Sequence, residues 1–162
     1  MKIWLNGALA EDVTLPATGS GWLMGDGIFE SLRTYNGAPF ALDRHLHRLV
    51  HSAKVMNFEA PDASLIKRGI EDLISAEPCL PYGRLRITLL SDGVIVITHI
   101  PYQDSDTRIA LAQHDFPQSS QRAITGVKTI SYAENSVALR RASERGFHDA
   151  LFINEDGLVV ET

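Results

Sequence analysis

Tight-turn sequences between short apolar runs constrain the fold of this chain most strongly. Asn6-Gly7, Asn36-Gly37 and Ser91-Asp92-Gly93 each separate two such runs, and the runs beside the last turn are rich in branched apolar residues. Asn-Gly and Asp-Gly favour turns whose twist matches that of paired antiparallel strands. The predicted strands cover residues 2–5, 8–10, 28–35, 39–42, 83–90 and 94–100. Hairpins thus outnumber βαβ units, so the sequence predicts an α+β class with antiparallel sheet.

Three segments have the pattern of helices. Asp43 precedes apolar residues at helical spacing and can cap a helix that runs to about residue 56. Asp62 can cap a second helix to about residue 75 in the same way. A third helix is predicted over residues 133–145, with Gly146 at the C-cap position. Further predictions are a glycine-rich loop at 16–27, a polar loop at 104–106 and a strand at 108–113.

Residues 116–122 have the composition of a linker and form the predicted domain boundary. They separate an N-terminal α+β domain, residues 1–115, from the beginning of a second, mainly β domain, residues 123–162. In this second domain we predict a strand over residues 124–130 and, after the helix, a hairpin that turns at residues 155–157. We expect the second domain to be incomplete.

Composition excludes several classes of protein. The 162 residues carry a net charge of −5, which gives no basic surface for nucleic acids or anionic membranes. A single cysteine, Cys79, excludes an internal disulfide and fits a reducing compartment. The N-terminus lacks the apolar core of a signal peptide, and no apolar run approaches the roughly 20 residues that span a bilayer. We therefore expect a soluble cytoplasmic protein without nucleic-acid or membrane partners.

Lys128 and Glu161 are candidate chemical groups near the C-terminal end. Lys128 lies on a predicted strand among uncharged, partly apolar residues. A lysine amine is a nucleophile only when it is unprotonated, a form that partial burial favours. An exposed strand lysine is the alternative, because lysine is rarely buried. Glu161 ends the last predicted strand, where a carboxylate that faces solvent is the alternative.

Two arginine positions suit anionic ligands. Arg48 lies beside the apolar stripe of the first predicted helix, where its guanidinium could bind a phosphate. Arg84 and Arg86 share one face of a strand by period-two alternation. Solvated positions are the alternative in both cases. His47 and His51 lie four apart on a helix but have no evident third ligand, so we predict no metal site.

Three separated blocks, in the right order, resemble the fold-type-IV pyridoxal-phosphate enzymes. The blocks are Gly25-Asp26-Gly27-Ile28-Phe29-Glu30, His45-Leu46-His47-Arg48-Leu49 and the segment from Lys128 to Glu161. This group contains branched-chain aminotransferases, D-amino-acid aminotransferases and 4-amino-4-deoxychorismate lyases. Its members continue well past the glutamate, so the chain resembles the N-terminal part of one.

The resemblance implies pyridoxal 5′-phosphate as cofactor and gives four residues a role in holding it. Lys128 would form the Schiff base with the cofactor and then move the proton of the substrate. Glu161 would pair with the pyridine nitrogen and keep it protonated, so that the ring can accept electrons. Tyr132 would hydrogen-bond the phenolic oxygen, and Arg48 would bind the phosphate.

Phe29 and Arg86 would face the substrate. At the position of Phe29 the D-amino-acid enzymes have a tyrosine and the other members a phenylalanine, which disfavours a D-amino acid. The resemblance implies amino transfer between an L-amino acid and a 2-oxo acid, in a homodimer. Two alternatives stay open: a 4-amino-4-deoxychorismate lyase that releases pyruvate and 4-aminobenzoate, and a non-catalytic remnant or binding module.

Overall fold

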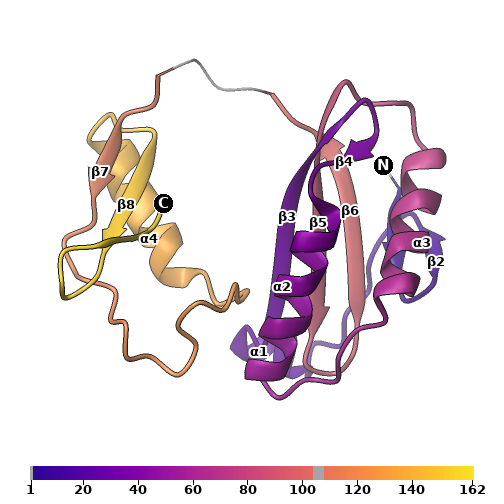
Figure 1. The fold of residues 1–162 in the computed structure, drawn as a ribbon, viewed down its shortest axis with the longest axis horizontal. Coiled ribbons are helices and arrows are strands. Elements are labelled where there is room, and N and C mark those ends of the chain that lie inside the picture. The colour runs from indigo at the N-terminus through magenta and orange to yellow at the C-terminus, as the bar shows by residue number, and fades with distance from the viewer. Residues whose placement is uncertain (1, 104–107) are drawn as a thin grey trace. The chain divides into compact units, whose positions relative to one another are not determined.

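The computed structural model describes residues 2–103 and 108–162 and divides the chain into two compact units (Figure 1). Unit 1 consists of Met1–Gln103 with Gly126–Ile130, and unit 2 of Asp104–Thr125 with Ser131–Thr162. The fold is α+β, as predicted. The polar loop predicted at residues 104–106 lies outside the described residues.

Unit 1 contains a six-stranded antiparallel sheet with the strand order β2-β1-β6-β5-β3-β4. Its strands are β1 (Ile3–Leu5), β2 (Ala8–Ala10), β3 (Gly27–Tyr35), β4 (Ala38–Pro39), β5 (Tyr82–Leu90) and β6 (Ile95–Pro101). The predicted hairpins are confirmed. In both Asn-Gly turns each residue has positive φ, 47° and 106° at Asn6-Gly7 and 48° and 80° at Asn36-Gly37, as the tight hairpin turn requires.

The helices of unit 1 are α1 (Ser20–Met24), α2 (Leu42–Val55) and α3 (Ala63–Ser75). The cap of α3 is confirmed, since the Asp62 carboxylate accepts the Ser64 N–H at 2.8 Å. The cap predicted for α2 is wrong. That helix starts directly after the β4 turn, with Ala41 at the N-cap position, and Asp43 lies in its first turn and pairs with Lys67 at 2.7 Å. The predicted loop at 16–27 is also wrong in part, because it contains α1.

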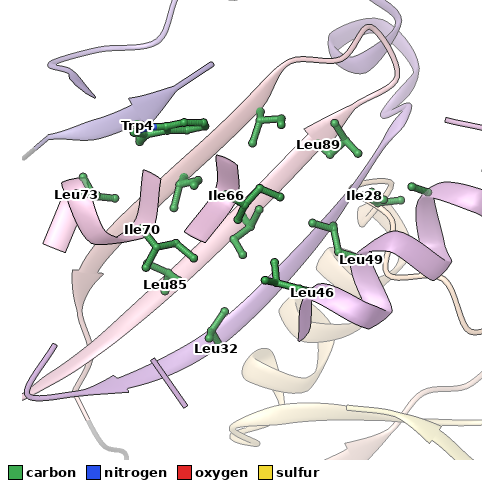
Figure 2. Close-up of a cluster of buried hydrophobic side chains, with 14 residues drawn as sticks. Trp4, Ile28, Leu32, Leu46, Leu49, Ile66, Ile70, Leu73, Leu85 and Leu89 are labelled. Carbon is green, nitrogen blue, oxygen red and sulfur yellow. The ribbon is translucent and has the colours of Figure 1, made fainter. Parts of the chain in front are cut away.

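The core of unit 1 lies between the sheet and helices α2 and α3, which cover the same face of it (Figure 1). Figure 2 shows Leu46 and Leu49 of α2 and Ile66, Ile70 and Leu73 of α3 beside side chains of β1, β3 and β5. Trp4 packs against Gly69 of α3, where a Cβ atom would lie 2.5 to 2.9 Å from three indole atoms. Glycine therefore sets how closely α3 approaches β1.

The other face of the sheet is more polar. Side chains alternate along β3, so Ile28, Glu30 and Leu32 face the helices, and Phe29, Ser31 and Arg33 point away from them. On β5, Thr88 lies opposite Phe29, and Arg86 opposite Ser31. Phe29 and Arg86 thus project from the same face of the sheet.

The segment Gly126–Ile130 lies along β3 as part of unit 1. The Phe29 N–H donates to the Lys128 carbonyl, and the Ile130 N–H to the Gly27 carbonyl, both at 2.9 Å. The strand predicted over residues 124–130 is reduced to one antiparallel bridge between Ile28 and Thr129. Within the predicted strand, the residues that bond β3 are Lys128, Thr129 and Ile130.

Unit 2 contains a three-stranded sheet and a helix: β7 (Leu111–Gln113), α4 (Ala133–Glu144), β8 (Asp149–Ile153) and β9 (Val159–Glu161). The hairpin of β8 and β9 is confirmed. The parallel pairing of β7 with β8, through α4, was not predicted. The helix packs on β8 through small residues, and its core is Ala112, Ala138, Ala142, Ala150 and Phe152.

The predicted linker, residues 116–122, is hydrogen-bonded within unit 2. The Gln118 N–H donates to the Ile153 carbonyl at 2.7 Å, and the Ser120 hydroxyl donates to Glu155 at 2.6 Å. The hydrogen bonds that the Ser120 hydroxyl and backbone N–H donate to Glu155 lower the pKa of the Glu155 carboxyl. The compact units thus divide at Gln103 and again around Gly126–Ile130, and the domain boundaries of 115 and 122 stay a prediction.

Candidate functional site

A single aromatic ring in unit 1 lies against two of the predicted site residues. The guanidinium carbon of Arg86 is 3.6 Å from the centroid of the Phe29 ring, and the Lys128 amine is 4.6 Å from the same centroid. Both cations are within the range of a cation–π interaction. Arg86 also donates from Nε to the Thr88 hydroxyl at 3.3 Å. The structure therefore brings Phe29, Arg86 and Lys128 together.

Glycine at position 27 allows the lysine segment to approach β3. A Cβ atom there would lie 2.9 Å from Ile130, from Leu90 and from the Leu89 carbonyl, closer than such atoms can pack. Val127, on the other side of Lys128, is partly buried against the core of unit 1. The residues that flank Lys128 are thus anchored, and its side chain extends from a fixed backbone.

Arg48 contacts a buried carboxylate that the sequence analysis did not single out. The Glu30 side chain is fully buried, and it accepts Arg48 Nε on Oε1 and Arg48 Nη2 on Oε2, both at 2.6 Å. His45 Nδ1 lies 2.8 Å from Glu30 Oε2. The signal was available: alternation along the strand places Glu30 on the same face as Ile28 and Leu32. A carboxylate in that position needs cationic or hydrogen-bonding partners.

In unit 2 the structure brings together Tyr132 and Glu161. Tyr132 is the N-cap residue of α4, and its hydroxyl donates to Glu161 Oε1 at 2.7 Å. Glu161 ends β9 and pairs there with Phe152 of β8. Both side chains are partly buried. The hairpin and the helix start together determine where the Glu161 carboxylate lies.

The predicted site residues therefore form three groups. Phe29, Arg86 and Lys128 lie together in unit 1, and Tyr132 and Glu161 lie together in unit 2. Arg48 lies with Glu30 and His45 on the helix-covered side of β3, the side opposite to Phe29.

A cavity of about 730 Å³ in unit 1 lies apart from these groups, between α3 and the start of α2. It contains the ion pair of Asp43 with Lys67, whose hydrogen bond lowers the pKa of the Asp43 carboxyl. None of the predicted site residues lines it. Across residues 2–103 and 108–162, no group of three His, Cys, Asp or Glu side chains could hold a metal ion. No helix in this part of the chain is long and apolar enough to span a bilayer.

Comparison with solved structures supports the fold. A branched-chain aminotransferase from Thermoproteus uzoniensis, crystallised with norvaline, matches 99% of this chain with a TM-score of 0.87 and 23% identity. The matched part is 62% of that protein. At this identity the match shows the same fold.

Curated sequence relatives include both lyases and transaminases. The bifunctional aminodeoxychorismate lyase / D-amino acid transaminase of Mycobacterium tuberculosis is 29% identical over 157 residues, covering 85% of this chain and 54% of the relative. The aminodeoxychorismate lyase of Bacillus subtilis is 27% identical over 184 residues, covering 98% of this chain and 61% of the relative. The chain thus spans little more than half the length of these relatives.

The family described as amino-transferase class IV matches residues 27–162. The match begins at the first residue of β3 and includes each residue discussed above: Phe29, Glu30, His45, Arg48, Arg86, Lys128, Tyr132 and Glu161. The chain belongs to the class IV aminotransferase family.

Proposed function

We propose that the protein carrying this chain transfers the amino group of an L-amino acid to a 2-oxo acid, with pyridoxal 5′-phosphate as cofactor. The observation that carries the proposal is the shared ring of Phe29, which holds the Lys128 amine and the Arg86 guanidinium on the same face of one sheet. This arrangement supplies a nucleophilic amine beside a group that binds carboxylates. Amino-acid and oxo-acid substrates both present a carboxylate to such a cation.

Pyridoxal 5′-phosphate is the cofactor of this family, and the chemistry of the residues present suits its phosphate and its ring nitrogen. Arg48 would hold the phosphate, because its side chain is half exposed and Glu30 fixes the direction of its guanidinium. Glu161 would pair with the ring nitrogen, because a carboxylate can accept several hydrogen bonds besides the one from Tyr132. When bound, the cofactor accepts the electrons left at the substrate Cα after proton loss.

Lys128 would transfer the substrate proton, and the substrate-facing residues would position the substrate. The Lys128 amine would take the proton from the substrate Cα and return it during transfer. Arg86 would fix the substrate carboxylate, and the Phe29 ring would keep the Arg86 guanidinium and the Lys128 amine in place. Phe29, rather than a tyrosine, is the basis for proposing an L-amino acid. The proposal includes a cytoplasmic homodimer.

A 4-amino-4-deoxychorismate lyase is the second candidate. It is favoured by the names of the two curated relatives given above. The same residues would hold the cofactor in both reactions. The reactions differ in their products, since a lyase releases pyruvate and needs no oxo-acid acceptor.

Borohydride reduction with pyridoxal 5′-phosphate tests the role of Lys128. We expect the label on Lys128 by peptide mapping and its loss in Lys128→Ala, because only this lysine lies in the proposed site. Lys67→Ala is the matched control, since Lys67 pairs with Asp43 elsewhere in unit 1, and it should keep the label. A label on Lys54 or Lys67 instead, or none, would contradict the cofactor assignment.

The products distinguish the two candidates. Mixing the cofactor-loaded protein with L-glutamate or a branched-chain L-amino acid, without acceptor, should produce the 2-oxo acid and pyridoxamine 5′-phosphate in equal amounts. A lyase should instead release pyruvate from aminodeoxychorismate. Pyruvate release without pyridoxamine 5′-phosphate from L-amino acids would overturn the transaminase in favour of the lyase.

A further inference from the structure

Glu30 is the most deeply buried charged side chain near the proposed site, with an exposed fraction of 0%. It projects from β3 toward α2 and meets two residues of that helix, Arg48 and His45. These two lie three positions apart and therefore share a helix face. Three contacts of 2.6 to 2.8 Å join this group, which we call the Glu30 cluster.

The geometry of the Glu30 cluster fixes the direction of the arginine. Two parallel N–H···O bonds hold one edge of the guanidinium plane to the carboxylate, an arrangement that sets orientation as well as distance. The His45 ring contacts Oε2, the oxygen that also accepts Arg48 Nη2, and so restrains the carboxylate itself. The Arg48 side chain as a whole is 49% exposed, whereas Glu30 is fully buried.

We propose that Glu30 is a positioning residue that acts through Arg48: it orients the guanidinium that binds the cofactor phosphate, and His45 steadies Glu30. This inference rests on the proposed function, in which Arg48 holds that phosphate. A long, half-exposed arginine loses side-chain entropy when it binds an anion. A guanidinium already held by a carboxylate has lost that entropy during folding, so less is lost on binding.

The alternative is that the Glu30 cluster only joins β3 to α2. A phosphate-dependent measurement separates the two roles. Pyridoxal lacks the phosphate of pyridoxal 5′-phosphate but carries the same aldehyde. The concentration that half-labels Lys128 after borohydride reduction is measured for each compound on the full chain, and their ratio gives the phosphate preference. A role confined to packing would change both concentrations together and leave this preference unchanged.

We expect Glu30→Gln to lower the phosphate preference about tenfold, the effect of one lost charge-assisted hydrogen bond. Arg48→Ala should remove the preference, and the double variant should resemble Arg48→Ala alone. His45→Ala leaves Glu30 and Arg48 in place and should lower the preference by a smaller factor. If Glu30→Gln does not fold, His45→Ala is the variant that tests the inference about Glu30. His47→Ala, an exposed position on the same helix, is the matched control and should leave the preference unchanged.

Each other outcome has a defined meaning. If Arg48→Ala keeps the wild-type preference, or if the wild type has none, the phosphate role in the proposed function is wrong and this inference falls with it. If Arg48→Ala loses the phosphate preference while the folded Glu30 and His45 variants keep it, Arg48 binds phosphate without being oriented by Glu30. The inference about Glu30 is then overturned, and the proposed function stands.

Discussion

The buried Phe29 ring lies against two basic side chains, Arg86 and Lys128. Arg86 approaches the ring to 3.6 Å and Lys128 to 4.6 Å, and the negative face of an aromatic ring attracts both. Two cations near one another would otherwise repel. The ring therefore lets an amine and a guanidinium occupy one small region of the sheet.

Replacing the ring tests this role. Phe29→Leu keeps an apolar side chain but removes the π face, so we expect labelling of Lys128 by pyridoxal 5′-phosphate and borohydride to slow about three- to tenfold, from the typical energy of such contacts. Phe29→Tyr keeps the ring and should label at close to the wild-type rate. Equal rates in all three proteins would show that the ring only fills space.

At the scale of elements, the contact of α3 with β1 depends on the absence of a side chain at Gly69. Alanine favours helix over glycine by roughly 1 kcal/mol, but its Cβ would lie 2.5 Å from the Trp4 indole. Trp4 is itself almost fully buried and can give way only by moving β1 or α3. The steric cost should therefore exceed the gain in helix propensity.

We expect Gly69→Ala to lower the free energy of unfolding by about 1–3 kcal/mol, the usual cost of overpacking. Urea unfolding followed by tryptophan fluorescence in a Trp22→Phe background, in which Trp4 is the remaining tryptophan, measures this change. Arg68→Ala, an exposed position next to Gly69 on α3, is the matched control and should change the free energy of unfolding by less than about 0.5 kcal/mol. A stabilised Gly69→Ala protein would show that α3 can move away from Trp4.

Local signals in the sequence predicted the elements that local interactions determine. The Asn-Gly turns gave the hairpins, and Asp62 gave the start of α3, because each signal acts within a few residues. The five-residue helix α1 has no side-chain cap and left no comparable signal. The parallel pairing of β7 with β8 joins strands that lie on either side of α4, a contact that no local pattern predicts.

In the candidate site, too, the sequence did not predict contacts between residues that are distant along the chain. The residue types at Lys128, Arg48 and Glu161 were available from the resemblance, and their proposed roles stay predictions. The partners of these residues were not available, because Glu30 with Arg48 and Tyr132 with Glu161 are contacts between separate elements. The pattern of a sequence gives chemical groups, whereas tertiary pairing decides which groups share a contact.

At the scale of the whole molecule, the two units respond to acid through different groups. Burial lowers the pKa of His99 in unit 1, where the ring bonds Thr34 at 2.8 Å. Hydrogen bonds to Ser120 lower the pKa of Glu155 in unit 2. In both cases the unfolded chain binds its proton at a higher pH than the folded chain does, so stability is lost as the pH falls.

The pH windows of these losses should differ. Unit 1 should weaken as the pH falls below about 6.5, the ordinary pKa of histidine, and unit 2 only below about 4.3, that of glutamate. Thermal unfolding followed by NMR signals of each unit, between pH 7.5 and 3.5, measures both. His99→Gln should reduce the loss of stability of unit 1 in the upper pH range and leave the loss in unit 2 unchanged. Ser120→Ala should reduce the loss of stability of unit 2 in the lower pH range and leave the loss in unit 1 unchanged. A common window, unchanged by either variant, would contradict the assignment.

The return of Gly126–Ile130 to unit 1 affects the order in which the chain can fold during synthesis. The first 103 residues contain all six strands and three helices of that unit, so its hairpins can pair as soon as they leave the ribosome. The segment carrying Lys128 emerges after residues 104–125, which belong to unit 2. The hydrogen bonds of Phe29 N–H to Lys128 and of Ile130 N–H to Gly27 can form only after that segment has emerged. The proposed catalytic amine is therefore added to a sheet that can already be formed.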